Sequence, residues 1–257
     1  MLKVVLLSVC LSICHAGMLD LTEMPIGYYQ KAASGVCISQ TLQACQGRFN
    51  QYLNITADQT DWTNPARLSY IINQYYNKGI DGLLSVCYAR QQFAACLGDQ
   101  YDACMSQTRF ISSGVPPDNA YQYIQIFKTI EFDCDGGFIQ SSRNWDCITY
   151  IKKTETQYFN KCTTDYNNAI QDPSKTCAAA FAYQVCMRKP YAGTCGVESS
   201  WWECERVRRS LSLDKQCSSS SCDSVLSKAA GSGNSSKAQL LNTLSDKFRA
   251  KSLELLQ

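Results

Sequence analysis

The segment CYARQQFAACLGDQYDAC, residues 87–104, carries three cysteines, Cys87, Cys96 and Cys104, separated by nine and eight residues. On a continuous helix, nine residues rise about 13.5 Å and turn to the opposite face, whereas a disulfide joins Cα atoms only about 4.4–6.8 Å apart. Neighbouring cysteines of this segment therefore cannot pair if it is helical. We predict that each is bridged to a distant segment and that the bridges join different helices.

The cysteine content of the whole chain predicts a disulfide framework. Sixteen cysteines are present, and the fourteen that lie between residues 37 and 222 allow seven bridges. Metal-binding sets have C-x2-C spacings, and none occurs here, so no metal or other cofactor is expected. The residues predicted to be bridged are Cys37, Cys45, Cys87, Cys96, Cys104, Cys134, Cys147, Cys162, Cys177, Cys186, Cys195, Cys204, Cys217 and Cys222.

Residues 1–16 have the pattern of a secretory signal peptide: Lys3, an apolar run over residues 4–13, and small residues at a cleavage site that ends at Ala16. We expect a secreted, extracellular protein. No later stretch reaches the roughly 18 uninterrupted apolar residues of a transmembrane segment. The only histidine, His15, leaves with the signal, which removes Ser-His-Asp and Cys-His catalysis and histidine-ligated metals.

The expected charge of the mature chain is close to neutral. The full chain has 24 basic and 22 acidic residues, and loss of Lys3 leaves 23 against 22, a net charge of +1. A nucleic-acid partner requires a basic face, so no nucleic-acid binding is expected.

Apolar residues recur at steps of three and four, which predicts an all-α fold, a disulfide-rich helical bundle. Helix starts are expected at Asn64-Pro65, Pro116-Pro117-Asp118 and Asp172-Pro173. Strand signals are weak. The predicted inward faces are Ile38, Leu42, Cys45, Phe49 and Tyr52; Leu68, Ile71, Ile72 and Tyr75, with a stop at Gly79; Ala120, Tyr123, Ile124 and Phe127; and, on one longer helix, Ile148, Ile151, Tyr158, Phe159, Cys162 and Tyr166.

Composition divides the chain after the signal into three parts. Residues 17–225 form the predicted helical domain, residues 226–236 a Gly/Ser-rich linker, and residues 237–257 an amphipathic helix that docks on a partner or on the domain itself, with membrane-surface binding a weaker alternative. Its apolar stripe is Leu241, Leu244, Phe248 and Leu255.

Cysteine spacings suggest a weak internal repeat, about 30–147 and 148–222. The spacings after Cys87 match those after Cys177, and the interval from Cys134 to Cys147 matches that from Cys204 to Cys217. Chance similarity stays an alternative.

The runs FDCDGGF (132–138), NWDC (144–147) and WECE (202–205) resemble signature positions of uncharacterised secreted cysteine-rich proteins of invertebrates, some of which belong to the organic matrix of mollusc shells. More loosely, the chain resembles the secreted twelve-cysteine helical modules of nematodes. Either resemblance implies an extracellular location and a structural or binding role, and neither supplies catalytic residues.

Several residues are candidates for modification or binding. Asn54 and Asn234 lie in N-glycosylation sequons. Asp133 and Asp135 flank Cys134 before two glycines and suggest a calcium site, although a solvated turn is the simpler interpretation. Further candidates are Trp201 and Trp202 with Arg206, Arg208 and Arg209 as a glycan-binding surface, against simple packing of the tryptophans, and Glu203 with Glu205 as a poor glycosidase pair.

The sequence therefore predicts a secreted, non-enzymatic protein stabilised by disulfides. A structural or interaction role in an extracellular matrix, such as a calcified shell matrix, is expected, with matrix proteins or glycans as partners. The alternatives are a carrier of a small apolar ligand, which needs a closed apolar cavity, and a histidine-free secreted hydrolase.

Overall fold

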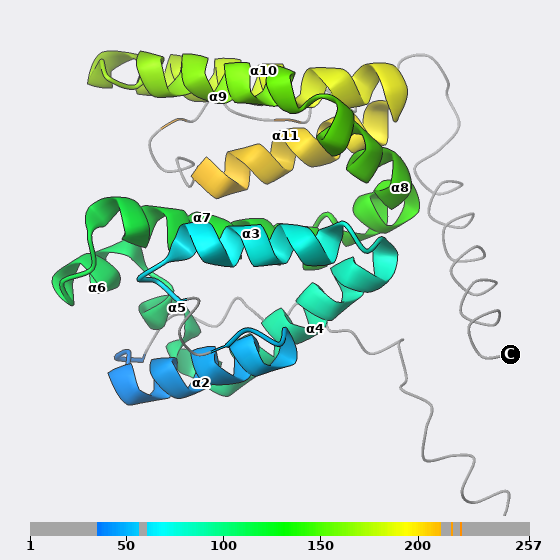
Figure 1. Cartoon of the computed structure of the whole chain (residues 1–257). Helices are drawn as coiled ribbons and strands as arrows, with labels where there is room; N and C mark the ends of the chain where they lie inside the picture. The colour runs from blue at the N-terminus through cyan, green and yellow to red at the C-terminus, as the bar shows by residue number, and fades with distance from the viewer. Residues whose placement is uncertain (1–34, 57–60, 212–216, 218–221, 223–257) are drawn as a thin grey trace, which may run out of the picture. The chain divides into compact units, whose positions relative to one another are not determined.

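The computed structural model describes residues 35–56 and 61–211 together with Cys217 and Cys222, all within one compact unit (Figure 1). This part of the chain contains no β-strand, so the all-α prediction is confirmed. The signal peptide, the linker, the C-terminal helix and Asn234 lie outside the described residues. The elements are α2 (Ser39–Tyr52), α3 (Pro65–Tyr76), α4 (Ile80–Leu97), η2 (Gly98–Gln100), α5 (Tyr101–Cys104), α6 (Gln107–Ser112), α7 (Pro117–Cys134), α8 (Phe138–Thr154), α9 (Thr156–Ala169), η3 (Pro173–Lys175), α10 (Thr176–Thr194) and α11 (Val197–Leu211).

Three helix starts are confirmed, two of them by a side-chain cap. The side chain of Asn64 accepts a hydrogen bond from the backbone N–H of Arg67 at 3.1 Å, and Pro65 opens α3. Pro117 opens α7 in the same way. Asp172 accepts from the backbone N–H of Ser174 at 3.0 Å, and a short 3₁₀ turn, η3, leads from there into α10. Proline suits the first turn because the N–H it lacks has no helical partner there.

The single longer helix predicted through residues 148–166 is wrong. It is two helices, α8 and α9, separated at Glu155, whose φ and ψ are −100° and 23°. Threonine hydroxyls compete for the carbonyls at this point, since Thr154 donates to Tyr150 O and Thr156 to Lys152 O. The apolar spacing continues across the break and therefore gave no sign of it.

Helices α4 and α7 form the centre of the core, and α4 also contacts α2 and α3. Phe49 of α2, Phe93 of α4 and Phe127 of α7 meet with ring centroids 4.8–5.9 Å apart. The predicted inward face of α2 holds for Leu42, Cys45 and Phe49, but Ile38 and Tyr52 at its two ends are exposed.

Seven disulfides form, and all fourteen predicted cysteines take part. Two of the bridges within residues 37–134, Cys45–Cys96 and Cys87–Cys134, join helix to helix, whereas Cys37 precedes α2. No bridge links neighbours within residues 87–104, so the prediction from their spacing is confirmed. Cα–Cα distances are 4.8–6.0 Å. The pairs are Cys37–Cys104, Cys45–Cys96, Cys87–Cys134, Cys147–Cys195, Cys162–Cys186, Cys177–Cys217 and Cys204–Cys222.

The bridges repeat in order along the chain. From Cys37 to Cys134, six cysteines pair first with fifth, second with fourth and third with sixth. From Cys147 to Cys217 the same order recurs when Cys204, which pairs with Cys222, is set apart. The bridge order thus matches Cys134 with Cys217, whereas the spacings matched it with Cys204. Helices α7 and α11, one from each half, pack against each other, and duplication of a helical module stays a prediction.

Candidate functional site

A group of charged side chains lies buried where α3, α7, α8 and α11 meet. We call Tyr76, Asp133, Lys152, Glu203 and Arg206 the buried charge cluster. The Tyr76 hydroxyl donates to Asp133 Oδ2 at 3.0 Å, and Arg206 Nε lies 3.3 Å from Asp133 Oδ1. Arg206 Nη1 lies 3.6 Å from Glu203 Oε2. Asp133 is 0 % exposed and Glu203 1 %, so one guanidinium serves two carboxylates inside the core.

Lys152 completes the cluster from α8. Its Nζ is buried, has no hydrogen-bond partner among the described residues, and lies 5.2–5.5 Å from the ring centroids of Tyr76, Trp145 and Trp202. The negative faces of aromatic rings attract a cation at this distance. The rings themselves pack edge to face, with Trp145 6.4 Å from Trp202.

Burial shifts the pKa values of this cluster away from their ordinary values. Desolvation lowers the pKa of Lys152 to about 8, and the charge of Arg206 acts in the same direction. Desolvation also raises the pKa of Glu203, against the opposing effect of Arg206. Such shifts are typical of catalytic groups. However, both carboxylates and the Lys152 Nζ are buried, so a reactant has no access to them in this structure.

The lowered pKa of Lys152 makes stability depend on pH. Below pH 8 the folded and unfolded chains both hold the proton, whereas between about pH 8 and 10.5 only the unfolded chain does. Stability from this group therefore rises with pH in that window, by about 1.4 kcal/mol per unit. We expect the free energy of unfolding of the unmodified protein, relative to Lys152→Met, to rise accordingly in urea titrations. Lys153→Met, at the exposed neighbouring residue, is the matched control. If the difference in free energy of unfolding between the unmodified protein and Lys152→Met does not change with pH, the pKa of Lys152 is not lowered.

The suggested calcium site does not form from Asp133 and Asp135. Asp133 belongs to the buried charge cluster, while Asp135 pairs with Arg90, whose Nη1 lies 2.9 Å from Asp135 Oδ2. No group of three or more metal-ligating side chains occurs in the described part. The solvated-turn interpretation is also wrong for Asp133, which lies in the last turn of α7 and is buried in the core. The adjacent Gly137 is needed for packing, because a Cβ there would lie 2.8 Å from Trp202 Cδ1.

The aromatic and basic residues of α11 do not form the glycan-binding surface considered from the sequence. Trp202 is 0 % exposed, and Trp201 packs on Phe132 at 6.1 Å between ring centroids. Arg208 Nη2 lies 2.7 Å from Glu205 Oε2, and Arg209 lies over Phe132. Glu203 and Glu205 therefore have different arginine partners and do not face a common site.

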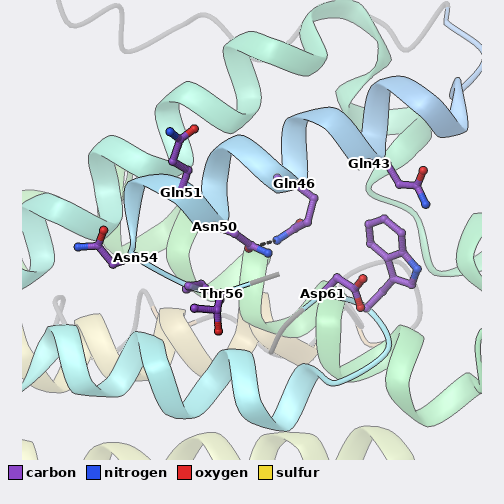
Figure 2. Close-up of a pocket in the computed structure, with 10 residues that line it drawn as sticks. Gln43, Gln46, Asn50, Gln51, Asn54, Thr56 and Asp61 are labelled. Atoms are coloured by element: carbon purple, nitrogen blue, oxygen red, sulfur yellow. Dashed lines mark hydrogen bonds between the residues drawn. The ribbon is translucent and has the colours of Figure 1, made fainter. Parts of the chain in front are cut away.

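An open groove of about 600 Å³ runs beside α2 (Figure 2). Seven of its ten described lining residues have polar or charged side chains, and it is open, unlike the closed apolar cavity that a carrier of apolar ligands needs. The side chains of Gln46 and Asn50, one turn apart on α2, hydrogen-bond across its floor, Nε2 to Oδ1, at 2.8 Å. The lining residues are Gln43, Gln46, Gly47, Asn50, Gln51, Asn54, Ile55, Thr56, Asp61 and Trp62.

The predicted glycosylation site Asn54 lies at the edge of this groove. It follows α2 with a φ of +48°, a left-handed conformation that asparagine tolerates. Its side chain is exposed and projects away from the Gln46–Asn50 pair in Figure 2. The site is thus open to glycosylation, which stays a prediction. The sequence did not single out this groove, although two amides at positions i and i+4 of a helix were a signal for it.

No protein-family model, curated protein or solved structure matches this chain. The described helices include none that is long and apolar enough to cross a bilayer.

Proposed function

We propose that this protein is a secreted, non-catalytic component of an extracellular matrix, with a calcified matrix as the first place to test. The observation that carries the proposal is the set of seven bridges, each of which ties together segments 18 to 67 residues apart. Disulfides of this density persist in oxidising compartments such as the extracellular space. A helical framework cross-linked at so many points is suited to persist outside the cell.

The non-catalytic part of the proposal is supported by the burial and pairing of the carboxylates. Asp133 of α7 is buried and paired with Arg206 of α11, whereas Glu203 and Glu205 are buried and paired with arginines of their own helix. All three carboxylates are thus engaged in ion pairs inside the core. The near-neutral charge further favours a framework or assembly role over direct mineral nucleation.

Secretion of the full chain from cultured animal cells tests the location. We expect the protein in the medium, beginning at or near Gly17, with a mass that shows seven bridges and no free thiol after alkylation. Treatment with an N-glycosidase should lower the mass if Asn54 or Asn234 carries sugar. Retention in the cell, or several free thiols in native material, would contradict the proposal.

The matrix role is tested by extraction. In tissue that makes the protein, antibodies should find it in the insoluble matrix fraction and release it only with denaturant or demineralising buffer. Recovery solely in the soluble fluid would overturn the matrix role while leaving secretion intact.

A further inference from the structure

We propose that the groove beside α2 is a binding site for an uncharged oligosaccharide. This proposal rests on the proposed extracellular role and names the class of partner that the protein would bind there. Its first support is charge. Asp61 is the only charged side chain among the described lining residues, and none is basic. Phosphate and sulfated or carboxylated glycans require basic partners, so an anionic ligand does not suit this groove.

The hydrogen-bonding groups of the groove suit sugar hydroxyls. A hydroxyl donates one hydrogen bond and accepts others, and a side-chain amide offers both functions within one planar group. Four amide side chains apart from the glycosylation candidate Asn54 line the groove, and the hydroxyl of Thr56 adds a further donor and acceptor. Gln43 and Gln51 are exposed at the rim, whereas Gln46 and Asn50 form the buried floor. The four amides are those of Gln43, Gln46, Asn50 and Gln51.

The floor of the groove is held in place from behind. Tyr123, which is fully buried, donates to Gln46 Oε1, and this leaves Gln46 Nε2 for Asn50 and the groove. Burial and the nearby Asp61 raise the pKa of Tyr123 well above its ordinary value, so it remains a donor. A site whose polar groups are already positioned loses less entropy when a ligand binds.

Trp62 supplies the aromatic wall. It is partly exposed, and its ring centroid lies 5.4 Å from that of Phe110 and 6.0 Å from that of Tyr123. Tryptophan combines an apolar face with a polar N–H, which suits the mixed faces of a pyranose ring. The adjoining turn is fixed, because Asp61 Oδ1 accepts from both the N–H and the hydroxyl of Thr63 at 2.6 Å. Asp61 Oδ2 takes part in neither bond. The volume, about 600 Å³, lies within the range of small-molecule sites, about 300–1,000 Å³.

Calorimetric titration of the full secreted protein, with its own N-linked sugars trimmed enzymatically, tests the proposal. The probes are uncharged oligosaccharides of glucose (β-1,3 and β-1,4), N-acetylglucosamine and mannose, with a heparin oligosaccharide as the charged comparison. We expect at least one uncharged probe to bind at low-millimolar concentration or below, and heparin not to compete.

Two variants identify the groove as the site. Gln43→Ala with Gln51→Ala changes only exposed side chains and should weaken binding about tenfold, while Trp62→Ala should weaken it further. Tyr150→Ala, at an exposed aromatic residue of α8, is the matched control and should leave affinity unchanged. Absence of binding by every uncharged probe, or equal binding by the glutamine variant, would overturn the proposal. Neither result depends on whether the protein is found in a matrix.

Discussion

Replacement of both cysteines of the Cys45–Cys96 bridge with alanine is expected to lower the free energy of unfolding by about 4 kcal/mol. The bridge joins α2 to α4 and closes a loop of 51 residues, and in the chain-entropy model a loop of that size contributes about this amount. Cys45 is also fully buried, so the variant loses packed sulfur as well. Denaturant titration without reductant, followed by circular dichroism, measures the loss.

The Cys204–Cys222 bridge provides the comparison, because it closes only 18 residues. Its double alanine variant should lose about 3 kcal/mol on the same model. The Cys45–Cys96 variant should in addition weaken binding in the groove, since Gln46 and Asn50 lie on the helix that this bridge anchors. A loss below about 1 kcal/mol for Cys45–Cys96 would mean that packing and the neighbouring Cys37–Cys104 bridge hold α2 without it.

The sequence predicted which cysteines are bridged better than it predicted how they pair. Helix geometry excludes pairing between Cys87 and Cys96 whatever the rest of the chain does, so the spacing alone was sufficient. The actual partners, Cys134 and Cys45, lie 47 and 51 residues away. They are selected by how α2, α4 and α7 pack, which periodicity within one helix does not specify.

The candidate sites show the same limit. Asp133 beside Asp135 and two glycines has the appearance of a polar turn, but it is buried by Tyr76 and Arg206, which are 57 and 73 residues away in sequence. The groove likewise joins an amide pair on α2 to an aromatic residue beyond its end. Local patterns thus identified the helices and the cross-linking, whereas each site depends on contacts between distant segments.

Asp133→Asn is expected to lower the free energy of unfolding by about 3–5 kcal/mol, because removal of one partner leaves the other charges buried and uncompensated. Asparagine keeps the shape of the side chain and can still accept from Tyr76. The loss therefore reports the missing charge opposite Arg206 and Lys152. Asp165→Asn is the matched control, since Asp165 is paired with Lys161 at 2.6 Å but both are largely exposed, and such pairs contribute about 0–1 kcal/mol.

A double-mutant cycle with Arg206→Met separates the charge effect from packing. If the Asp133–Arg206 pair is a compensated unit, the double variant should be less destabilised than the sum of the single variants, by about 0.5–3 kcal/mol. Glu203 limits the recovery, because it loses its arginine in the double variant and retains only Lys152 nearby. Its raised pKa offers a further check. The double variant should gain stability as the pH falls and Glu203 takes up a proton, since the folded chain then binds that proton more tightly than the unfolded chain. Strict additivity of the two single variants would show that Asp133 is held by its surroundings and not by Arg206.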